Sequence, residues 1–560
     1  MEYTGAQILI ESLIEQGVEV VFGYPGGAVL NIYDALYEKQ DKIRHILASH
    51  EQGAAHAADG YARSTGKTGV VLATSGPGAT NLVTGIAAAY HDSVPLVALT
   101  GNVARDLIGR SSFQEVDIVS ITKPVVKKNY FITDASQIAE TVREAFQIAG
   151  SGRKGPVLID FPKDVTAQRV PYVPAGRAVP LSNPKPDEEA LQKVADLISQ
   201  SRRPLIYCGG GVTFSDGAEQ LQRFAKKLQI PVCMSMMGLT SMPAGSELNL
   251  GMVGMHGTAT ANTAVTQCDL LLAVGARFSD RVAGNRKLFA KNATIVHLDI
   301  CPEEIGKNVR ADCGVVGDAG EILSDLEERL PPMEHSEWVH SLLRHKALNA
   351  LPVAKSEGEE LNPREVIAVL RTLAGPEAIV VTDVGQHQML VAQYYAFTKP
   401  RSFLSSCGLG AMGYGMGAAN GACIGNPGRP VILFTGDGSF HMNMAELAVA
   451  VTHRLPIVVI VMNNGVLGMV HQWQKLFYQG RYSYTCINRK TDFCKLAEAF
   501  GATGLRIQKS SDIRPVLQQA LACGGPCVVD CVIPVGQRVF PIIPPGGKED
   551  DMIFYEDYPM

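Results

Sequence analysis

The stretch Gly436-Asp437-Gly438-Ser439 follows an apolar run at 431–435, and a second apolar run at 457–462 ends at Asn463-Asn464. Apolar runs of this length, bounded by Gly, Pro and Asn, are typical of buried strands in a parallel sheet. A helix predicted at about 443–453 would cross between them. Both polar tips are therefore expected at the carboxyl edge of one sheet, where open α/β sheets bind ligands.

Asp437 and Asn464 would place a carboxylate and an amide oxygen at neighbouring strand ends. Such hard oxygen ligands suit Mg²⁺, which usually takes one or two carboxylates and completes its shell with water and phosphate oxygens. The flanking glycines allow backbone N–H groups to approach a phosphate closely. The stretch therefore predicts a magnesium-diphosphate site and, with Asn463-Asn464 at the end of the next strand, resembles the corresponding motif of thiamine-diphosphate enzymes. Gly-Asp-Gly alone is also compatible with a simple tight turn.

The composition is that of a globular protein of several domains. The chain has 560 residues, of which 46% are hydrophobic and 19% charged, so about three domains are expected. A net charge of −5 gives no electrostatic footprint for nucleic acid or an anionic membrane. The sequence shows neither a membrane-spanning run nor a signal or transit segment, so we expect a cytoplasmic protein.

Twelve cysteines are present, but none forms a Cys-x-x-Cys pair. Several lie inside apolar runs, and the spacing of Cys523, Cys527 and Cys531 is interrupted by Gly524-Gly525-Pro526. Buried, reduced thiols are therefore expected rather than disulfides or a metal site.

Strand, loop and helix patterns alternate along the whole chain, which predicts an α/β fold with three doubly wound parallel-sheet domains. Pro-rich or charged stretches at about 170–186 and 331–362 are the expected linkers. The predicted domains are 1–170, 187–330 and 362–535, the last of which holds the metal motif. The resemblance implies that 1–170 binds the pyrimidine of the coenzyme and that 187–330 is an FAD-binding domain. Residues 536–560 would form a tail that helps to cover the active site.

Glu51 is a single carboxyl group at the start of a small, apolar segment. A helix cap is the ordinary interpretation of such a residue. However, low polarity also favours a protonated or proton-sharing carboxyl, as needed to hydrogen-bond the aminopyrimidine of thiamine diphosphate.

Four motifs together resemble the catalytic subunits of the acetohydroxyacid synthase (acetolactate synthase) family, in the order expected for it: Tyr24-Pro25-Gly26-Gly27, His50-Glu51-Gln52-Gly53, Ser75-Gly76-Pro77-Gly78-Ala79-Thr80-Asn81 and Gly436-Asp437-Gly438 with Asn463-Asn464. The resemblance covers nearly the whole chain. It implies thiamine diphosphate and Mg²⁺ as cofactors, and a homodimer or homotetramer with active sites at the subunit interface. A separate small regulatory subunit is a further implied partner.

The resemblance also assigns roles residue by residue. Glu51 would activate the coenzyme, Met412 would support its two rings, and Gln114 and Lys163 would line the approach to the reacting carbon. The backbone carbonyl of Val466 would join Asp437 and Asn464 as a metal ligand. The remaining residues implied to contact thiamine diphosphate are Pro25, Gly26, Pro77, Asn81, Val384, Gly385, Gln386, His387, Gly410, Gly438 and Ser439.

The substrates implied by the resemblance are small 2-ketoacids. Pyruvate would lose CO₂, and its two-carbon unit would be added to a second pyruvate or to 2-oxobutanoate. The products, 2-acetolactate or 2-aceto-2-hydroxybutanoate, are precursors of valine, leucine and isoleucine. Arg281 would grip the carboxylate of the acceptor, Trp473 would shape the pocket for its alkyl group, and Phe113 would line the entrance.

FAD is the third implied cofactor, in a structural role. The matching positions are Arg153, Gly209, Gly210, Gly211, His256, Arg277, Asp299 and Asp318. Ser279 stands where the family usually has Asp, and Ala104 stands where many members have Pro. The alternatives are a 2-ketoacid decarboxylase, a flavin-free catabolic acetolactate synthase, and a scaffold that binds the cofactor without catalysis.

Overall fold

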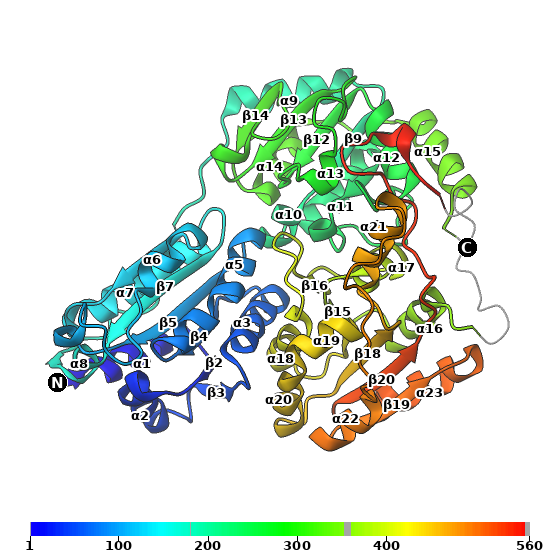
Figure 1. Cartoon of the computed structure of the whole chain (residues 1–560). Helices are drawn as coiled ribbons and strands as arrows, with labels where there is room; N and C mark the ends of the chain where they lie inside the picture. Colours follow the sequence, from blue (N-terminus) through cyan, green and yellow to red (C-terminus); the bar gives the residue numbers. More distant parts are fainter. Residues whose placement is uncertain (1, 180, 352–359, 555–560) are drawn as a thin grey trace.

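Three six-stranded parallel sheets form the frame of the molecule, and each belongs to one third of the chain. The computed structural model describes residues 2–179, 181–351 and 360–554. In Figure 1 the N-terminal domain lies to one side, and the central and third domains lie one above the other. The predicted fold class is therefore confirmed. The predicted linker at 331–362 and the predicted tail at 536–560 each extend partly outside the described residues.

The N-terminal sheet has the strand order β3-β2-β4-β5-β7-β6. Helix α1 begins at a capping box, in which the Thr4 side chain accepts from the N–H of Gln7 and the Gln7 side chain accepts from the N–H of Thr4. The strands are β2 (Val20–Tyr24), β3 (Arg44–Leu47), β4 (Gly69–Ala73), β5 (Leu96–Asn102), β6 (Lys128–Phe131) and β7 (Pro156–Pro162), with a small separate pair of β1 (Glu2–Thr4) and β8 (Arg169–Pro171); the helices are α1 (Gly5–Glu15), α2 (Leu30–Glu38), α3 (Glu51–Thr65), α4 (Pro77–Asn81), α5 (Val83–Asp92), α6 (Ile118–Thr122), α7 (Ile138–Gly150) and α8 (Lys163–Ala167).

The central sheet has the order β11-β10-β9-β12-β13-β14. Its elements are β9 (Pro204–Cys208), β10 (Val232–Met234), β11 (Asn249–Met252), β12 (Leu270–Val274), β13 (Thr294–Asp299), β14 (Cys313–Val316), α9 (Glu188–Gln200), α10 (Gly210–Phe214), α11 (Ala218–Leu228), α12 (Ala259–Gln267), α13 (Asp280–Ala283), α14 (Ala319–Arg329) and α15 (Ser336–Leu348). Helix α15 lies inside the stretch predicted as a linker. Its Trp338 and Leu342 are buried in the core of the central domain, so this part of the prediction was wrong.

The third sheet has the order β16-β15-β17-β18-β20-β19. Its elements are β15 (Ile379–Thr382), β16 (Phe403–Ser405), β17 (Val431–Gly436), β18 (Ile457–Asn463), β19 (Thr503–Ile507), β20 (Cys527–Val532), α16 (Pro363–Ala374), α17 (Gln386–Tyr394), α18 (Tyr414–Gly425), α19 (Asp437–Asn443), α20 (Leu447–Thr452), α21 (Gly468–Phe477), α22 (Phe493–Phe500) and α23 (Ser510–Ala522). Strands β17 and β18 pair in parallel, as the sequence predicts. The helix predicted at 443–453 instead begins at Asp437 and is interrupted by a 3-10 turn, η7 (Met444–Glu446).

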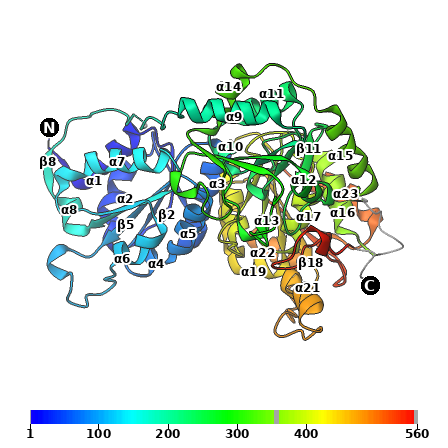
Figure 2. The same ribbon diagram turned by 90° about the horizontal axis from the view of Figure 1, so that it is seen from above.

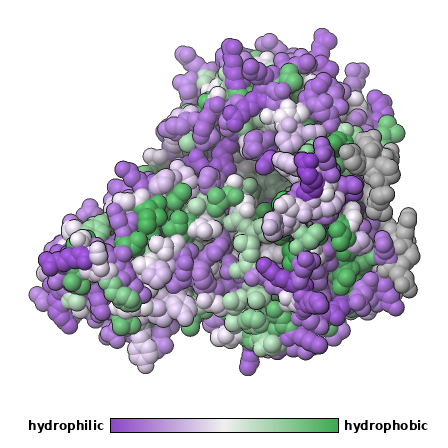
Figure 3. All heavy atoms as spheres, viewed as in Figure 1, coloured by the Kyte–Doolittle hydropathy of each residue, from purple (hydrophilic) through white to green (hydrophobic). Residues whose placement is uncertain are grey.

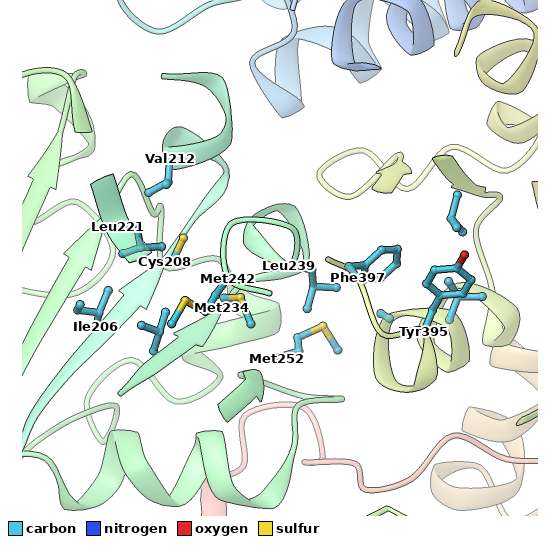
Figure 4. Close-up of a cluster of buried hydrophobic side chains, with 14 of the residues drawn as sticks. Ile206, Cys208, Val212, Leu221, Met234, Leu239, Met242, Met252, Tyr395 and Phe397 are labelled. Atoms are coloured by element: carbon cyan, nitrogen blue, oxygen red, sulfur yellow. The ribbon is translucent and has the colours of Figure 1, made fainter. Parts of the chain in front are cut away.

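The central and third domains share one hydrophobic core. Figure 4 shows Leu239 and Met252 of the central domain beside Phe397 and Tyr395 of the third. The N–H of Ala244 donates to the carbonyl of Phe397 across this boundary at 2.8 Å. The view from above in Figure 2 shows these two domains overlapping, with the N-terminal domain beside them.

Helices α3 and α18 join the N-terminal domain to the third domain through small residues. A Cβ added to Gly421 would lie 1.8 Å from the carbonyl oxygen of Ala57, and one added to Gly60 would lie 2.2 Å from that of Ala418. The two helix backbones therefore approach so closely that no side chain fits between them.

We expect Gly421→Ala to lower the thermal unfolding midpoint of the chain, with a loss of stability of about 1–3 kcal/mol, because the added methyl group overpacks this contact. The midpoint is measured by circular dichroism. Gly245→Ala is the matched control, because a Cβ there meets nothing within 4 Å. An unchanged midpoint in Gly421→Ala would mean that the helices separate at little cost.

Two further predictions, one on the cysteines and one on membrane-spanning segments, concern the whole chain. The twelve cysteines are free thiols, but Cys486 is exposed and four others are only half-buried, so the prediction of burial was wrong for these five. Among the described residues, no group of three or more His, Cys, Asp and Glu is arranged to hold a metal ion on its own. In the same residues, no helix combines the length and apolar character needed to cross a membrane.

Candidate functional site

A cavity of about 70 Å³ opens at the carboxyl edge of the third sheet. Loops that follow β15, β17 and β18 surround it, because parallel strands bring their ends to one edge. It brings together all but one of the third-domain residues predicted to hold the metal and the coenzyme: Val384, Gly385, Gln386, His387, Met412, Asp437, Gly438, Ser439, Asn464 and Val466. The exception, Gly410, lines a larger neighbouring cavity.

The donor atoms in this cavity suit a hydrated cation and a diphosphate. Burial raises the pKa of Asp437 to about 6, and a bound cation would favour its ionised form. The Asn464 side-chain oxygen accepts from the N–H of Val466, which fixes the turn that carries both residues. The Nε2 atom of His387 is buried and has no hydrogen-bond partner within the described residues. Burial lowers the pKa of this imidazole to about 4, so it is neutral near pH 7.

Asp383 fixes the loops around this cavity, and sequence reasoning missed it. Its carboxylate accepts from the N–H groups of Val384, Gly413 and Gly415, at 3.0, 2.8 and 3.3 Å. Burial raises its pKa to about 6, although these N–H donors favour the charged form. Its position directly after an apolar run, in the segment before Val384-Gly385, was the available signal.

A second group of predicted residues lies at the carboxyl edge of the N-terminal sheet. The Asn81 side chain donates to Oε2 of Glu51 at 2.9 Å. A Cβ added to Gly78 would lie 3.2 Å from Oε1 of Glu51, and one added to Gly26 would lie 2.5 Å from the Thr74 side chain. Glu51, Asn81, Gly26 and Gly78 therefore surround one small region above β2 and β4.

Glu446 supports this group from the third domain of the same chain. Its carboxylate accepts from the N–H groups of Ser49 and His50, the two residues before Glu51, at 3.1 and 2.9 Å. Burial, with a smaller contribution from the neighbouring Glu51 carboxyl, raises the pKa of Glu446 to about 7, although the two N–H donors oppose this shift. The backbone that leads into Glu51 is thus held by a buried acid.

The N-terminal group is separate from the third-domain cavity within one chain. None of Glu51, Asn81, Gln114 and Lys163 lines either this cavity or the larger one described next. Pro25, Pro77 and Lys163 lie at the surface, and Phe113 is 87% exposed. The residues predicted for the two ends of one coenzyme therefore do not meet in the described part of a single chain.

A cavity of about 840 Å³ lies where the three domains meet, because residues of each domain line it. Figure 3 shows a hollow in this region of the surface. The cavity is lined by every residue predicted to contact FAD: Arg153, Gly209, Gly210, Gly211, His256, Arg277, Asp299 and Asp318. Its volume is in the range of small-molecule sites.

Two side chains of this cavity have marked electrostatic properties. Burial raises the pKa of Asp299 to about 6 and lowers that of His256 to about 4. The Nδ1 atom of His256 is buried and has no hydrogen-bond partner among the described residues. Ser279, where a carboxylate was expected from the resemblance, also lines the cavity. The donor set fits a ligand that carries several polar groups.

The large cavity also reaches the predicted substrate residues. Arg281, Trp473 and Met412 are among its lining residues. The Arg281 guanidinium lies 5.6 Å from the centre of the Trp473 ring, a cation–π contact. Its nearest carboxylate is Asp280 at 3.7 Å, and its side chain is 61% exposed. An accessible cation beside an apolar ring suits a small acid with an alkyl group.

The C-terminal segment packs beside α21. The Gln472 side chain both donates to the carbonyl of Val539 and accepts from its N–H, at 3.0 and 2.9 Å. Phe540 and Ile542 are buried against a cluster that includes Trp473. The tail is therefore anchored next to the predicted acceptor pocket.

Comparison with known proteins agrees with this arrangement. Three family models match: "Thiamine pyrophosphate enzyme, N-terminal TPP binding domain" over residues 3–121, "Thiamine pyrophosphate enzyme, central domain" over 191–326, and "Thiamine pyrophosphate enzyme, C-terminal TPP binding domain" over 383–531. They fall on the three sheets in turn.

Similar curated proteins match nearly end to end. A probable acetolactate synthase large subunit of Methanocaldococcus jannaschii is 45% identical, and the match covers 98% of this chain and 95% of that protein. The acetolactate synthase large subunit of Parasynechococcus marenigrum is 45% identical over 99% and 92%, and that of Corynebacterium glutamicum is 44% identical over 98% and 90%. The chain therefore belongs to the acetolactate synthase large-subunit family of thiamine pyrophosphate enzymes.

Proposed function

We propose that this chain is the catalytic subunit of an acetolactate synthase with thiamine diphosphate, Mg²⁺ and FAD as cofactors. It transfers the two-carbon unit of decarboxylated pyruvate to a second pyruvate or to 2-oxobutanoate, in the synthesis of branched-chain amino acids. The observation that best supports the transfer to a second ketoacid is the accessible Arg281 guanidinium beside Trp473, in the cavity that Met412 also lines. A decarboxylase needs no such cation, because it has no second ketoacid to hold.

Thiamine diphosphate, when bound, supplies a thiazolium ring that accepts the electrons left by decarboxylation. Asp437 and Asn464, with the carbonyl of Val466, would hold Mg²⁺, and Gln386, His387, Gly438 and Ser439 would hold the diphosphate. Gly410 and Met412 would contact the thiazolium side. The common lining of one cavity by most of these residues supports the assignment.

The Glu51 carboxyl would hold the proton at the far nitrogen of the aminopyrimidine. Asn81 occupies Oε2 of Glu51, which leaves Oε1 for that nitrogen. Pro25, Gly26 and Pro77 would line the ring. Gln114, Lys163 and the exposed Phe113 would line the approach to the reacting carbon.

The separation of Glu51 from the third-domain cavity supports a site shared by two copies of the chain, in a homodimer or a homotetramer. Each copy would supply Asp437 to the site in its own third domain and Glu51 to the site of its partner. The relatives are named large subunits, which supports a separate small regulatory subunit as a further partner. FAD would lie in the 840 Å³ cavity. Its role would be structural, since the proposed reaction involves no net oxidation or reduction.

The purified chain with Mg²⁺, thiamine diphosphate and pyruvate should produce acetolactate, because Arg281 retains the second ketoacid. Adding 2-oxobutanoate should give 2-aceto-2-hydroxybutanoate as well. Products are identified by chromatography, and bound flavin is measured by absorbance on the same sample. Acetaldehyde as the main product would favour a 2-ketoacid decarboxylase, and acetolactate formation without flavin would favour the catabolic type.

Arg281→Gln tests, in the same assay, whether Arg281 holds the second ketoacid. Loss of the charge should shift the products from acetolactate toward acetaldehyde, because the acceptor is held less tightly while decarboxylation continues. Arg286→Gln, at a nearby exposed cation, is the control and should leave the product ratio unchanged.

A further inference from the structure

The loop between β16 and α18 carries Gly410 and Met412 and lines the large cavity, yet part of its backbone is held by another domain. The N–H of Cys407 donates to one oxygen of Asp92 at 3.0 Å, and the N–H of Gly408 donates to the other at 2.8 Å. Asp92 is the last residue of α5, in the N-terminal domain of the same chain. One carboxylate therefore fixes two consecutive amides of this loop.

Arg63, near the end of α3, aligns that carboxylate. Its guanidinium donates to Asp92 at 2.9 Å and to the carbonyl of Ser405 at 3.0 Å. It also donates to Asp59, at 2.6 and 3.2 Å, and to the Met237 sulfur at 3.6 Å. Asp59 accepts from the Tyr414 hydroxyl as well. The Arg63 and Asp92 side chains are 5% and 0% exposed. Arg63 thus holds the end of β16 through Ser405, and it holds the loop that follows through Asp92.

Joining two domains through this buried network costs free energy, because its charged groups must be desolvated. A carboxylate at the C-terminal end of a helix faces the negative end of the helix dipole. Buried ion pairs can often be replaced by apolar groups of similar volume without loss of stability, and the α3–α18 contact already joins the domains. Apolar packing, however, cannot fix the direction of two loop N–H groups and a carbonyl.

The other end of the loop is also fixed. The N–H of Ala411 donates to the Ser406 hydroxyl at 3.1 Å, and the N–H of Gly413 donates to Asp383 at 2.8 Å. Met412 therefore enters both cavities from a segment held by Asp92 on one side and by Asp383 on the other.

We propose that Asp92, aligned by Arg63, is a positioning residue that fixes the Ser406–Met412 segment, and with it the support that Met412 gives to the coenzyme. The inference rests on the proposed function. In a dimer with shared sites, α3 would then serve two coenzymes. Glu51 at its start would contact the partner's coenzyme, and Arg63, about 18 Å along the helix, would order the loop of its own chain's site.

Asp92→Asn tests the proposal with little change of shape, because the carboxamide offers an NH₂ group to one of the two loop N–H donors. In the cofactor-free chain, deuterium exchange of the amides in 405–412 should rise about tenfold or more, as measured by mass spectrometry. With thiamine diphosphate and Mg²⁺ bound, exchange of the coenzyme C2 proton, followed by NMR after acid quench, should slow by about 10- to 100-fold. The pyruvate KM should stay within about twofold.

Gly408→Ala provides a second variant that leaves Arg63 and Asp92 intact. The added Cβ would lie 2.8 Å from an oxygen of Asp92, so it should push the loop away and give the same two changes. Glu377→Gln is the control, because this exposed carboxylate of the third domain pairs with Lys399 and lies outside the network. If Asp92→Asn does not fold, Gly408→Ala decides.

Amide exchange and C2 exchange at wild-type rates in a folded variant would overturn the proposal. If the wild-type chain itself shows no C2 exchange with thiamine diphosphate, the proposed function fails instead. The two failures are therefore distinguishable.

Discussion

Glu51→Gln should lower kcat by about 10²–10⁴-fold, because an amide cannot hold or release the proton that a general acid–base group transfers. The substitution keeps the size of the side chain, and an amide oxygen can still accept from Asn81, which donates to Glu51 at 2.9 Å. The affinity for thiamine diphosphate with Mg²⁺ should change by no more than a few-fold, since the predicted diphosphate ligands lie in another cavity. Steady-state kinetics and C2 proton exchange of the bound coenzyme measure the two effects separately.

Glu19→Gln is the matched control for this variant. Glu19 belongs to the same domain, is exposed and pairs only with the surface residue Lys67 among the described residues, so its loss should leave kcat unchanged. Normal C2 exchange in Glu51→Gln would refute the assignment of Glu51. Loss of coenzyme binding in Glu51→Gln would instead indicate that Glu51 has a structural role at the start of α3.

Asp437→Ala should abolish Mg²⁺-dependent binding of thiamine diphosphate, with a loss of affinity beyond about 100-fold. Removal of groups that merely orient metal ligands already costs about 10–100-fold, and Asp437 is the only carboxylate predicted to bind this metal. The coenzyme is titrated into cofactor-free chain at fixed Mg²⁺ and followed by isothermal calorimetry. Raising the Mg²⁺ concentration should not restore the affinity.

Glu498→Gln, at an exposed carboxylate on α22, provides the comparison and should bind the coenzyme normally. If Asp437→Ala kept its Mg²⁺-dependent affinity, the magnesium site would have to lie elsewhere. The thermal unfolding midpoint of the cofactor-free variant near pH 7 should be no lower than that of the wild type, because the change removes a carboxyl whose pKa burial raises and whose ionised form therefore opposes folding.

The sequence predicted β17 and β18, two central strands of the third sheet, because these strands are apolar almost throughout. All six residues of β17 except Gly436 are buried, as are all residues of β18 except Asn463. The edge strands β3 and β6 were not predicted, since their half-exposed residues, such as those of 44–47 and 128–131, lack a continuous apolar run. Helix α19 was predicted to start too late, because Gly-Asp-Gly also suits a turn.

The candidate site was predictable where it lies at strand ends. The residues around Asp437, Gly385 and Gly209 all follow buried strands, so the parallel sheets bring them to common edges. Asp92, Arg63 and Glu446 could not be predicted in this way. Their partners in the third domain or, for Glu446, in the N-terminal domain lie more than 300 positions away in the chain. A single sequence does not show which charged residues meet after folding.

Glu51 lies outside the cavity that Asp437 lines, and this has a genetic consequence for the dimer proposed above. Each coenzyme would take its acid from one gene copy and its metal ligands from the other. A cell that carries one allele with Glu51→Gln and another with Asp437→Ala would therefore regain growth without added valine, leucine or isoleucine. In its mixed dimers, one site contains both substituted residues, and the other site contains neither.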